Sequence, residues 1–426
     1  MFEEAKNEIL QAIRSFESIV DAHEHLAPER DRVAMQPDVC FLFSHYLTGS
    51  LHAAGFDLGD GRVLSRGQVR EFLLDASRPV EERFSVLERF IPAVRETSYA
   101  QAMWRALQDL YGFDDITREN FMAITEAMRQ ANTPGIYDRI LSDKCRIRFA
   151  LTQQGRTDYT EPYMVPVLHL SMLHSFPEGK ETLIRRSEKL GLNVQSLDDY
   201  LDLCRLQLVQ WRDRERVVGM KTHSQPYVPP PDRDEASVLF DRLLRSGSFD
   251  AGENAALERY LREELIAMCG ELDLTVAVHA GVWDDFRQLD PRHNIPLIVK
   301  YPQTRFDIYH MGMPWVRDTL FLAGNWHNVY INWCWAHIVS FYMAQTSIRE
   351  YVDFVPVNKI MAFGGDYSAP AVEKVYGHLT MAQENVAAAL AWMVTDRRMT
   401  TDRAIEVARM WFWDNPVRIY GLDRFL

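Results

Sequence analysis

Short apolar runs alternate with longer amphipathic segments along most of the chain. Strand-like runs cover residues 19–25, 145–151, 165–170, 217–222, 274–279, 306–310, 329–333 and 360–363. Segments with helical spacing of apolar positions include residues 2–17, 196–211, 253–270, 371–394 and 401–412. Strands that alternate with helices form a parallel sheet, and a count of eight favours closure. The pattern therefore predicts an α/β fold, a (β/α)8 TIM-like barrel.

A helix-rich stretch interrupts this alternation between the first and second runs. Helical spacing appears at residues 38–54, 66–77, 79–91, 97–111 and 117–130, with glycine and proline between them. Loops that follow barrel strands lie on the catalytic face, so we expect a helical insertion there. The expected parts are residues 1–33 (N-terminal helix and first strand), 34–142 (the insertion over the catalytic face) and 143–426 (the rest of the barrel with C-terminal helices).

The amino-acid composition limits which kinds of molecule the protein is expected to bind. The net charge of −13 argues against nucleic acid or an anionic membrane as the main partner. No stretch approaches the roughly 20 apolar residues that span a bilayer, and the N-terminus lacks the features of a signal peptide. Five scattered cysteines without a CxxC pair favour reduced thiols. We therefore expect a cytoplasmic protein, assembled as a homo-oligomer, that acts on a small molecule.

Residues that bind metals fall at the ends of several predicted strands. His23 and His25 are two positions apart on the first strand, so both side chains point the same way and can reach one divalent cation. His279, His310 and Asp366 end or follow later strands. Because strand ends of a barrel converge on one mouth, the spacing predicts a metal centre there. Zinc suits this donor set, and manganese or iron would also fit.

The chain resembles the amidohydrolase superfamily in these same motifs. They are His23-Glu24-His25, His279-Ala280-Gly281, His310-Met311-Gly312 and Gly364-Gly365-Asp366, found in the strand order of that superfamily. The resemblance implies a (β/α)8 fold and a metal held by His23, His25, His279 and Asp366. It also implies that His310 contacts the substrate or the metal.

Within the superfamily, uronate isomerase and its relatives resemble this chain in the insertion after the first strand. The shared feature is His45-Tyr46 followed by a helical stretch that ends at Ala54-Gly55. The resemblance implies that His45 and Tyr46 reach the active site. It extends to Arg287 downstream of the fifth strand and to Trp333 at the seventh, which are candidate substrate-binding residues.

Three departures from the isomerase pattern bear on the reaction. Ser368 stands where the isomerases carry an arginine, His169 ends the third strand without an expected arginine, and His310 is an additional histidine. These departures favour hydrolysis of a small polar substrate by a metal-activated water. The alternatives are aldose–ketose isomerisation of a sugar acid, a decarboxylase or lyase reaction, and a metal-free barrel that only binds a ligand.

The expected chemistry assigns a role to each remaining candidate. In the hydrolase reading, Asp366 accepts a proton from the water and His310 holds the reacting oxygen of the substrate. Lys221, on the fourth strand, and His223, just after it, are expected to bind a substrate carboxylate or hydroxyl. Lys221 could instead be carboxylated and bridge two metal ions, as in two-metal members of the superfamily. One metal is the favoured reading.

Overall fold

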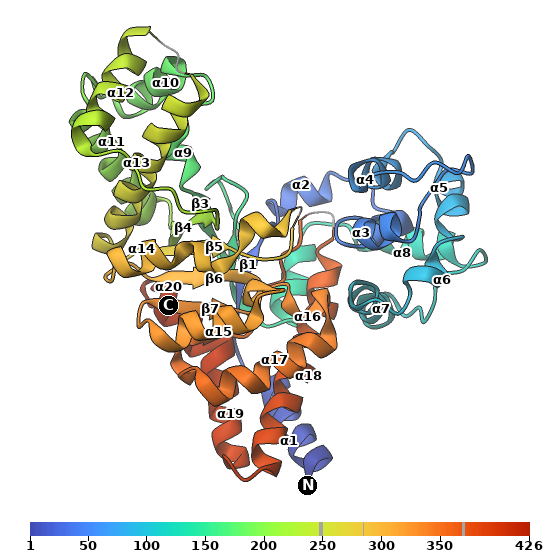
Figure 1. Cartoon of the computed structure of the whole chain (residues 1–426). Coiled ribbons are helices and arrows are strands. Elements are labelled where there is room, and N and C mark those ends of the chain that lie inside the picture. The colour runs from blue at the N-terminus through green and yellow to red at the C-terminus, as the bar shows by residue number, and fades with distance from the viewer. Residues whose placement is uncertain (247–249, 284, 369–370) are drawn as a thin grey trace. The chain divides into compact units, whose positions relative to one another are not determined.

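One parallel sheet of eight strands organises the protein. The computed structural model describes residues 1–246, 250–283, 285–368 and 371–426. The strands are hydrogen-bonded in sequence order from β1 to β8 (Figure 1). They are β1 (Ile19–Glu24), β2 (Ile147–Thr152), β3 (Met164–His169), β4 (Gly219–His223), β5 (Thr275–His279), β6 (Phe306–Ile308), β7 (Val329–Asn332) and β8 (Ile360–Met361).

Backbone hydrogen bonds return from the segment after β8 to β1. Ala22 N donates to Phe363 O at 3.0 Å, and Asp366 N donates to His23 O at 2.8 Å. All six residues of β1 are buried, as expected for a parallel strand covered on both faces. The predicted (β/α)8 barrel is therefore confirmed. Strands β6 and β8 end two residues earlier than the sequence pattern predicts.

The chain divides into two compact units. Unit 1 comprises residues 1–154, 158–164 and 333–414, and unit 2 comprises residues 155–157, 165–332 and 415–426. The longer helices of unit 1 are α1 (Phe2–Ser15), α3 (Leu47–Ala53), α4 (Arg66–Leu74), α5 (Val80–Leu87), α7 (Ser98–Tyr111), α8 (Phe121–Ala131), α17 (Phe341–Phe354), α18 (Glu373–Thr395) and α19 (Thr401–Arg409). Those of unit 2 are α10 (Lys180–Leu190), α11 (Leu197–Arg214), α12 (Arg233–Ser246), α13 (Ala251–Glu271), α14 (Ile295–Lys300), α15 (Val316–Asn325) and α20 (Asn415–Tyr420).

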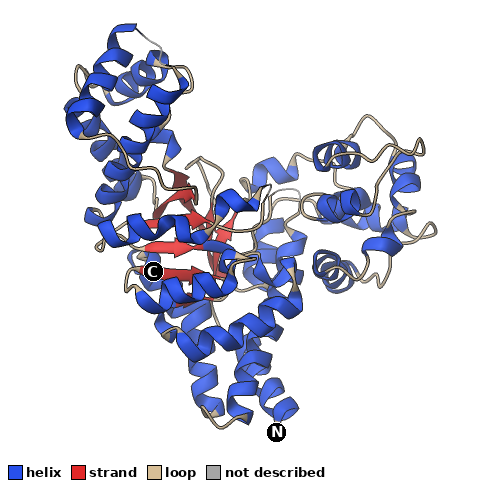
Figure 2. Cartoon of the chain, in the orientation of Figure 1, coloured by secondary structure: helices blue, strands red, loops and turns tan. Residues whose placement is uncertain are grey.

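The segment between β1 and β2 is built from helices and loops, as predicted (Figure 2). It begins with α2 (Glu29–Val33), followed by the 3-10 helix η1 (Val39–Phe43), and also contains the short α6 (Ile91–Val94). It encloses a hydrophobic core of its own, to which η1 and α3 to α8 contribute. Phe84 and Phe121 stack in this core with ring centroids 4.4 Å apart. Arg83 and Asp38 form a buried ion pair at 2.7 Å. A segment with its own core can hold its loops in a defined conformation.

Helix α18 is the most buried long helix of unit 1. Most of its side chains are buried, including the charged residues Glu373 and Lys374 in its first turn. It packs against α1, α7 and α17. No helix among the described residues is long and apolar enough to span a bilayer.

Candidate metal centre and active site

His23 of β1, His25 just after this strand and Asp366 past β8 converge in unit 1. His23 Nε2 and His25 Nε2 lie 3.0 Å and 3.4 Å from the same carboxylate oxygen, Asp366 Oδ1. The three ligand atoms lie within 4.8 Å of one another. The side chain of His23 is fully buried, whereas that of His25 is 28% exposed. Two imidazoles and a carboxylate at this spacing suit a divalent cation with one side open to a ligand.

The two glycines before Asp366 allow the approach of the β8 segment to β1. A Cβ at Gly364 would lie 2.9 Å from His23 Cβ, and one at Gly365 would lie 1.8 Å from Glu24 Oε1. Asp366 itself has a φ of 59°, in the left-handed region that non-glycine residues seldom adopt. The Gly-Gly-Asp sequence therefore sets the backbone position from which the carboxylate reaches both histidines.

Two buried carboxyl groups accept hydrogen bonds from the backbone around the proposed metal ligands. Asp21 accepts hydrogen bonds from the backbone N–H of Gly365 at 3.0 Å and of His23 at 3.3 Å. Glu24 accepts one from Tyr367 N at 2.8 Å. Burial raises the pKa of Asp21 to about 7, and burial with the neighbouring Asp21 raises the pKa of Glu24. The acidic residues Asp21 and Glu24 in an otherwise apolar strand were a sequence signal for this supporting role. The sequence analysis assigned them no such role.

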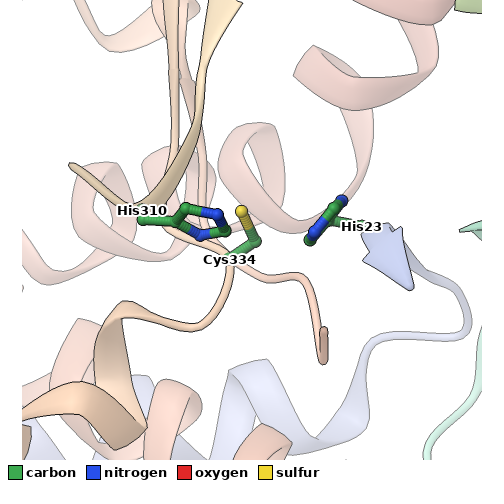
Figure 3. Close-up of side chains that lie close together, drawn as sticks. All are labelled: His23, His310 and Cys334. Carbon is green, nitrogen blue, oxygen red and sulfur yellow. The ribbon is translucent and has the colours of Figure 1, made fainter. Parts of the chain in front are cut away.

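A thiol also borders His23. Cys334 is fully buried just after β7, and its Sγ lies within 4.8 Å of a His23 ring nitrogen (Figure 3). The sequence predicts reduced thiols and no role for a cysteine at the site. Nothing in the spacing of Cys334 along the chain distinguishes it from the other four.

His45 and Tyr46 belong to the same cluster of side chains as Asp366. Tyr46 Oη donates to the backbone oxygen of Asp366 at 2.7 Å. The Tyr46 ring stacks on Trp335, with centroids 4.6 Å apart, and contacts the His45 ring at 4.0 Å. Burial, followed by the nearby Asp366, raises the pKa of Tyr46 well above its ordinary value. The phenol therefore keeps its proton at neutral pH.

The imidazole of His45 is neutral and available for a ligand. Burial, followed by the charge of Lys374, lowers the pKa of His45 to about 3. Its Nδ1 is buried and has no hydrogen-bond partner among the described residues. Its backbone φ of 67° is left-handed, which indicates a segment held in place by its surroundings.

In unit 2, histidines end adjacent strands. His223 and His279 are paired in register at the ends of β4 and β5, with ring centroids 5.4 Å apart. His310 Nε2 lies 3.0 Å from His279 Nδ1. His310 lies in a turn after β6 with a φ of 63°. That His279 joins the metal ligands of unit 1 stays a prediction.

The predicted substrate-binding residues occupy different environments. Lys221 is buried on β4, with its Nζ 5.8 Å from the centroid of the Tyr309 ring. The Arg287 side chain is 79% exposed and pairs with Asp285 at 2.8 Å. Trp333 has no exposed surface and packs edge-on against Trp411, with centroids 5.0 Å apart. Roles for these residues and for the exposed His223 in binding a substrate stay predictions.

Comparisons with known proteins place this architecture in a family. The family model described as Amidohydrolase matches residues 180–422, more than half of the chain. The chain therefore belongs to the amidohydrolase family, whose superfamily consists of enzymes that typically depend on a metal.

Relatives and structural neighbours extend the match over the whole chain. The uronate isomerase of Cutibacterium acnes is 22% identical, with 95% of this chain and 93% of that protein aligned. The glucuronate isomerase of Caulobacter crescentus superposes with a TM-score of 0.77 at 18% identity, over 99% of this chain and 95% of the other. The uronate isomerase of Thermotoga maritima gives 0.76 at 14%, over 98% and 97%. The structural matches confirm the fold. Hydrolysis of a small polar substrate stays a prediction.

Proposed function

We propose that the protein is a metal-dependent isomerase of a sugar acid, which interconverts an aldose and a ketose form of a uronate. The observation that carries this proposal is the convergence of His23, His25 and Asp366 in a chain aligned with a uronate isomerase over almost the full length of both. The hydrolase predicted from the departures at Ser368, His169 and His310 is replaced by the isomerase alternative. The identity of the uronate is left open.

The donor set fits a divalent cation. Two imidazole nitrogens converge on one carboxylate oxygen, and the backbones of Asp366 and His23 are joined by the 2.8 Å bond from Asp366 N to His23 O. His23, His25 and Asp366 would hold the ion, with His279 as the proposed fourth ligand. When bound, such a cation polarises the carbonyl and hydroxyl oxygens of a substrate.

The different protonation states of His45 and Tyr46 at neutral pH indicate different roles in the reaction. Aldose–ketose isomerisation moves one proton between adjacent carbons and another between their oxygens. Tyr46 keeps its proton and would donate a hydrogen bond to a substrate oxygen or to Asp366 O. His45, neutral and with an unpartnered Nδ1 among the described residues, is the better proton acceptor of the two. Asp366 would carry the proton that moves between the oxygens.

The test is direct conversion of glucuronate and galacturonate by the metal-loaded protein. Proton NMR in D2O follows the reaction, because isomerisation replaces the signals of the aldose with those of the ketose. We expect the ketose signals to appear with the wild-type protein and to be absent with Asp366→Asn. Conversion of neither uronate, together with turnover of an ester or amide substrate, would restore the hydrolase reading.

A further inference from the structure

Lys374 is a buried lysine that the proposed chemistry does not use. It lies in the first turn of α18 and is 1% exposed. Its Nζ donates to the backbone oxygens of Ser44 at 2.8 Å and Leu42 at 3.2 Å, and lies 5.4 Å from the centroid of the Tyr367 ring. Removing a lysine from water is unfavourable unless its charge is well coordinated, so these contacts are a specific arrangement.

The two carbonyl oxygens that Lys374 binds belong to Leu42 and Ser44, three residues and one residue before His45. They belong to the end of η1 and to the residue after it, where the chain turns into the left-handed conformation of His45. On the other side of this turn, Thr48 donates to His45 O from both its backbone N, at 3.2 Å, and its hydroxyl, at 2.5 Å. The turn that carries His45 and Tyr46 is thus held at both ends, by Lys374 before it and by Thr48 after it.

Neighbouring contacts fix the helix that carries Lys374. Glu373 accepts hydrogen bonds from Arg32 at 2.8 Å and from the Tyr111 hydroxyl at 2.9 Å. At Gly377, an added Cβ would lie 1.8 Å from the backbone oxygen of Ala102 in α7, so the two helices touch through their backbones. The position of Lys374 is therefore set by the packing of α18 against the insertion.

We propose that Lys374 is a positioning residue whose ammonium group holds the Leu42–Tyr46 segment in the conformation that presents His45 and Tyr46 beside Asp366. The expected effect on turnover rests on the proposed isomerase function. The expected effect on the conformation of the segment rests on the contacts described above. Burial lowers the pKa of His45 most, and the charge of Lys374 lowers it further, because a cation beside an imidazole disfavours its protonation.

The experiment compares Lys374→Met with a second buried lysine, Lys359→Met. Lys359 ends the 3-10 helix η6 (Val357–Lys359) and is 7% exposed, so both variants remove a buried ammonium group from unit 1. Hydrogen exchange is followed by mass spectrometry on a peptide spanning residues 39–47. We expect at least about a tenfold faster exchange of this peptide in Lys374→Met and no change in Lys359→Met. Because the metal ligands lie outside the held segment, both variants should bind as much zinc as the wild type.

Kinetic measurements on the same variants distinguish a positioning role of Lys374 from a general effect on the stability of the fold. For uronate isomerisation, we expect kcat to fall about 10- to 100-fold in Lys374→Met and to stay near the wild-type value in Lys359→Met. Lys374→Gln, which keeps one donor on a shorter stem and tolerates burial better, should be intermediate in both measurements. Unchanged exchange at residues 39–47 in the Met and Gln variants would overturn the proposal, as would equal acceleration in Lys359→Met. If the wild-type protein converts no uronate, the isomerase function fails, and the exchange measurement still decides the role of Lys374.

Discussion

Asp366 and His23 are joined twice, once through their backbones and once through their side chains. Asp366 N donates to His23 O at 2.8 Å, and His23 Nε2 lies 3.0 Å from Asp366 Oδ1. The first contact belongs to the closure of the barrel and the second to the proposed metal centre. Fold and site therefore depend on the same pair of residues.

Replacing Asp366 with Asn should abolish turnover while the fold is retained. The amide keeps the size of the side chain and leaves the backbone bond to His23 intact, but it can neither accept a proton at neutral pH nor bind a cation as strongly. We expect kcat to fall at least about 100-fold. Steady-state kinetics on a uronate and far-ultraviolet circular dichroism check the two parts. An active, folded variant would exclude Asp366 from proton transfer.

Adding a methyl group at Gly365 should distort the site. In Gly365→Ala, the new Cβ would meet Glu24 Oε1 at 1.8 Å, and the backbone has no room to retreat from β1. We expect a loss of about 1–3 kcal/mol in the free energy of unfolding and weaker zinc binding. Gly67→Ala in α4 is the matched control, because a Cβ there meets nothing within 4 Å and alanine favours a helix. Equal stability of the two variants would contradict the close contact.

Removal of metal should lower the melting temperature, and its return should restore it. A ligand that binds only the folded state adds about 2.7 kcal/mol at a concentration 100-fold above its dissociation constant. We expect one zinc or manganese ion per chain by elemental analysis. Lys221→Met should leave that ratio at one, because the proposed centre does not use this lysine. Two ions in the wild type and one in the variant would instead indicate a carboxylated Lys221.

Asp307 should make stability depend on pH in unit 2. It is fully buried on β6 and accepts a hydrogen bond from the Tyr420 hydroxyl at 2.6 Å. Burial raises its pKa from 3.8 to about 7. Between these values the folded protein holds a proton that the unfolded chain has lost, so this residue's contribution to the free energy of unfolding falls as pH rises through that window.

The variant Asp307→Asn isolates this effect, because it imitates the protonated acid and still accepts the bond from Tyr420. Its stability relative to wild type should increase from pH 4 to pH 7, by up to about 1.4 kcal/mol per pH unit. Denaturant unfolding of both proteins at several pH values measures the difference. A constant difference across the window would show that Asp307 is ionised in the folded state.

The strands were predictable because they depend on the pattern of neighbouring residues in the sequence. Buried parallel strands appear as short apolar runs, and His23 and His25 share one face because side chains alternate along a strand. His310 was predicted as a strand end, but it lies in a left-handed turn, and residue type alone does not signal that conformation. The contact with His279 nevertheless brings its imidazole beside β5.

The supporting residues were harder to predict, because their roles arise from packing between distant segments. Lys374 lies in a helix of ordinary spacing, where a lysine is usually exposed. Its burial follows from the contact of α18 with the insertion, which involves residues more than 300 positions earlier. Trp333, predicted to bind substrate, is fully buried against Trp411. Its position at a strand end does not signal this burial, and a role for Trp333 in binding substrate stays a prediction.

The meeting of β1 with the segment after β8 also has a consequence for synthesis of the protein. In a growing chain, His23 and His25 leave the ribosome more than 300 residues before their carboxylate partner Asp366. An incomplete product therefore has two histidines without the group that completes their binding site. Premature termination before residue 366 would yield a protein unable to assemble this centre, however well its helical insertion folds.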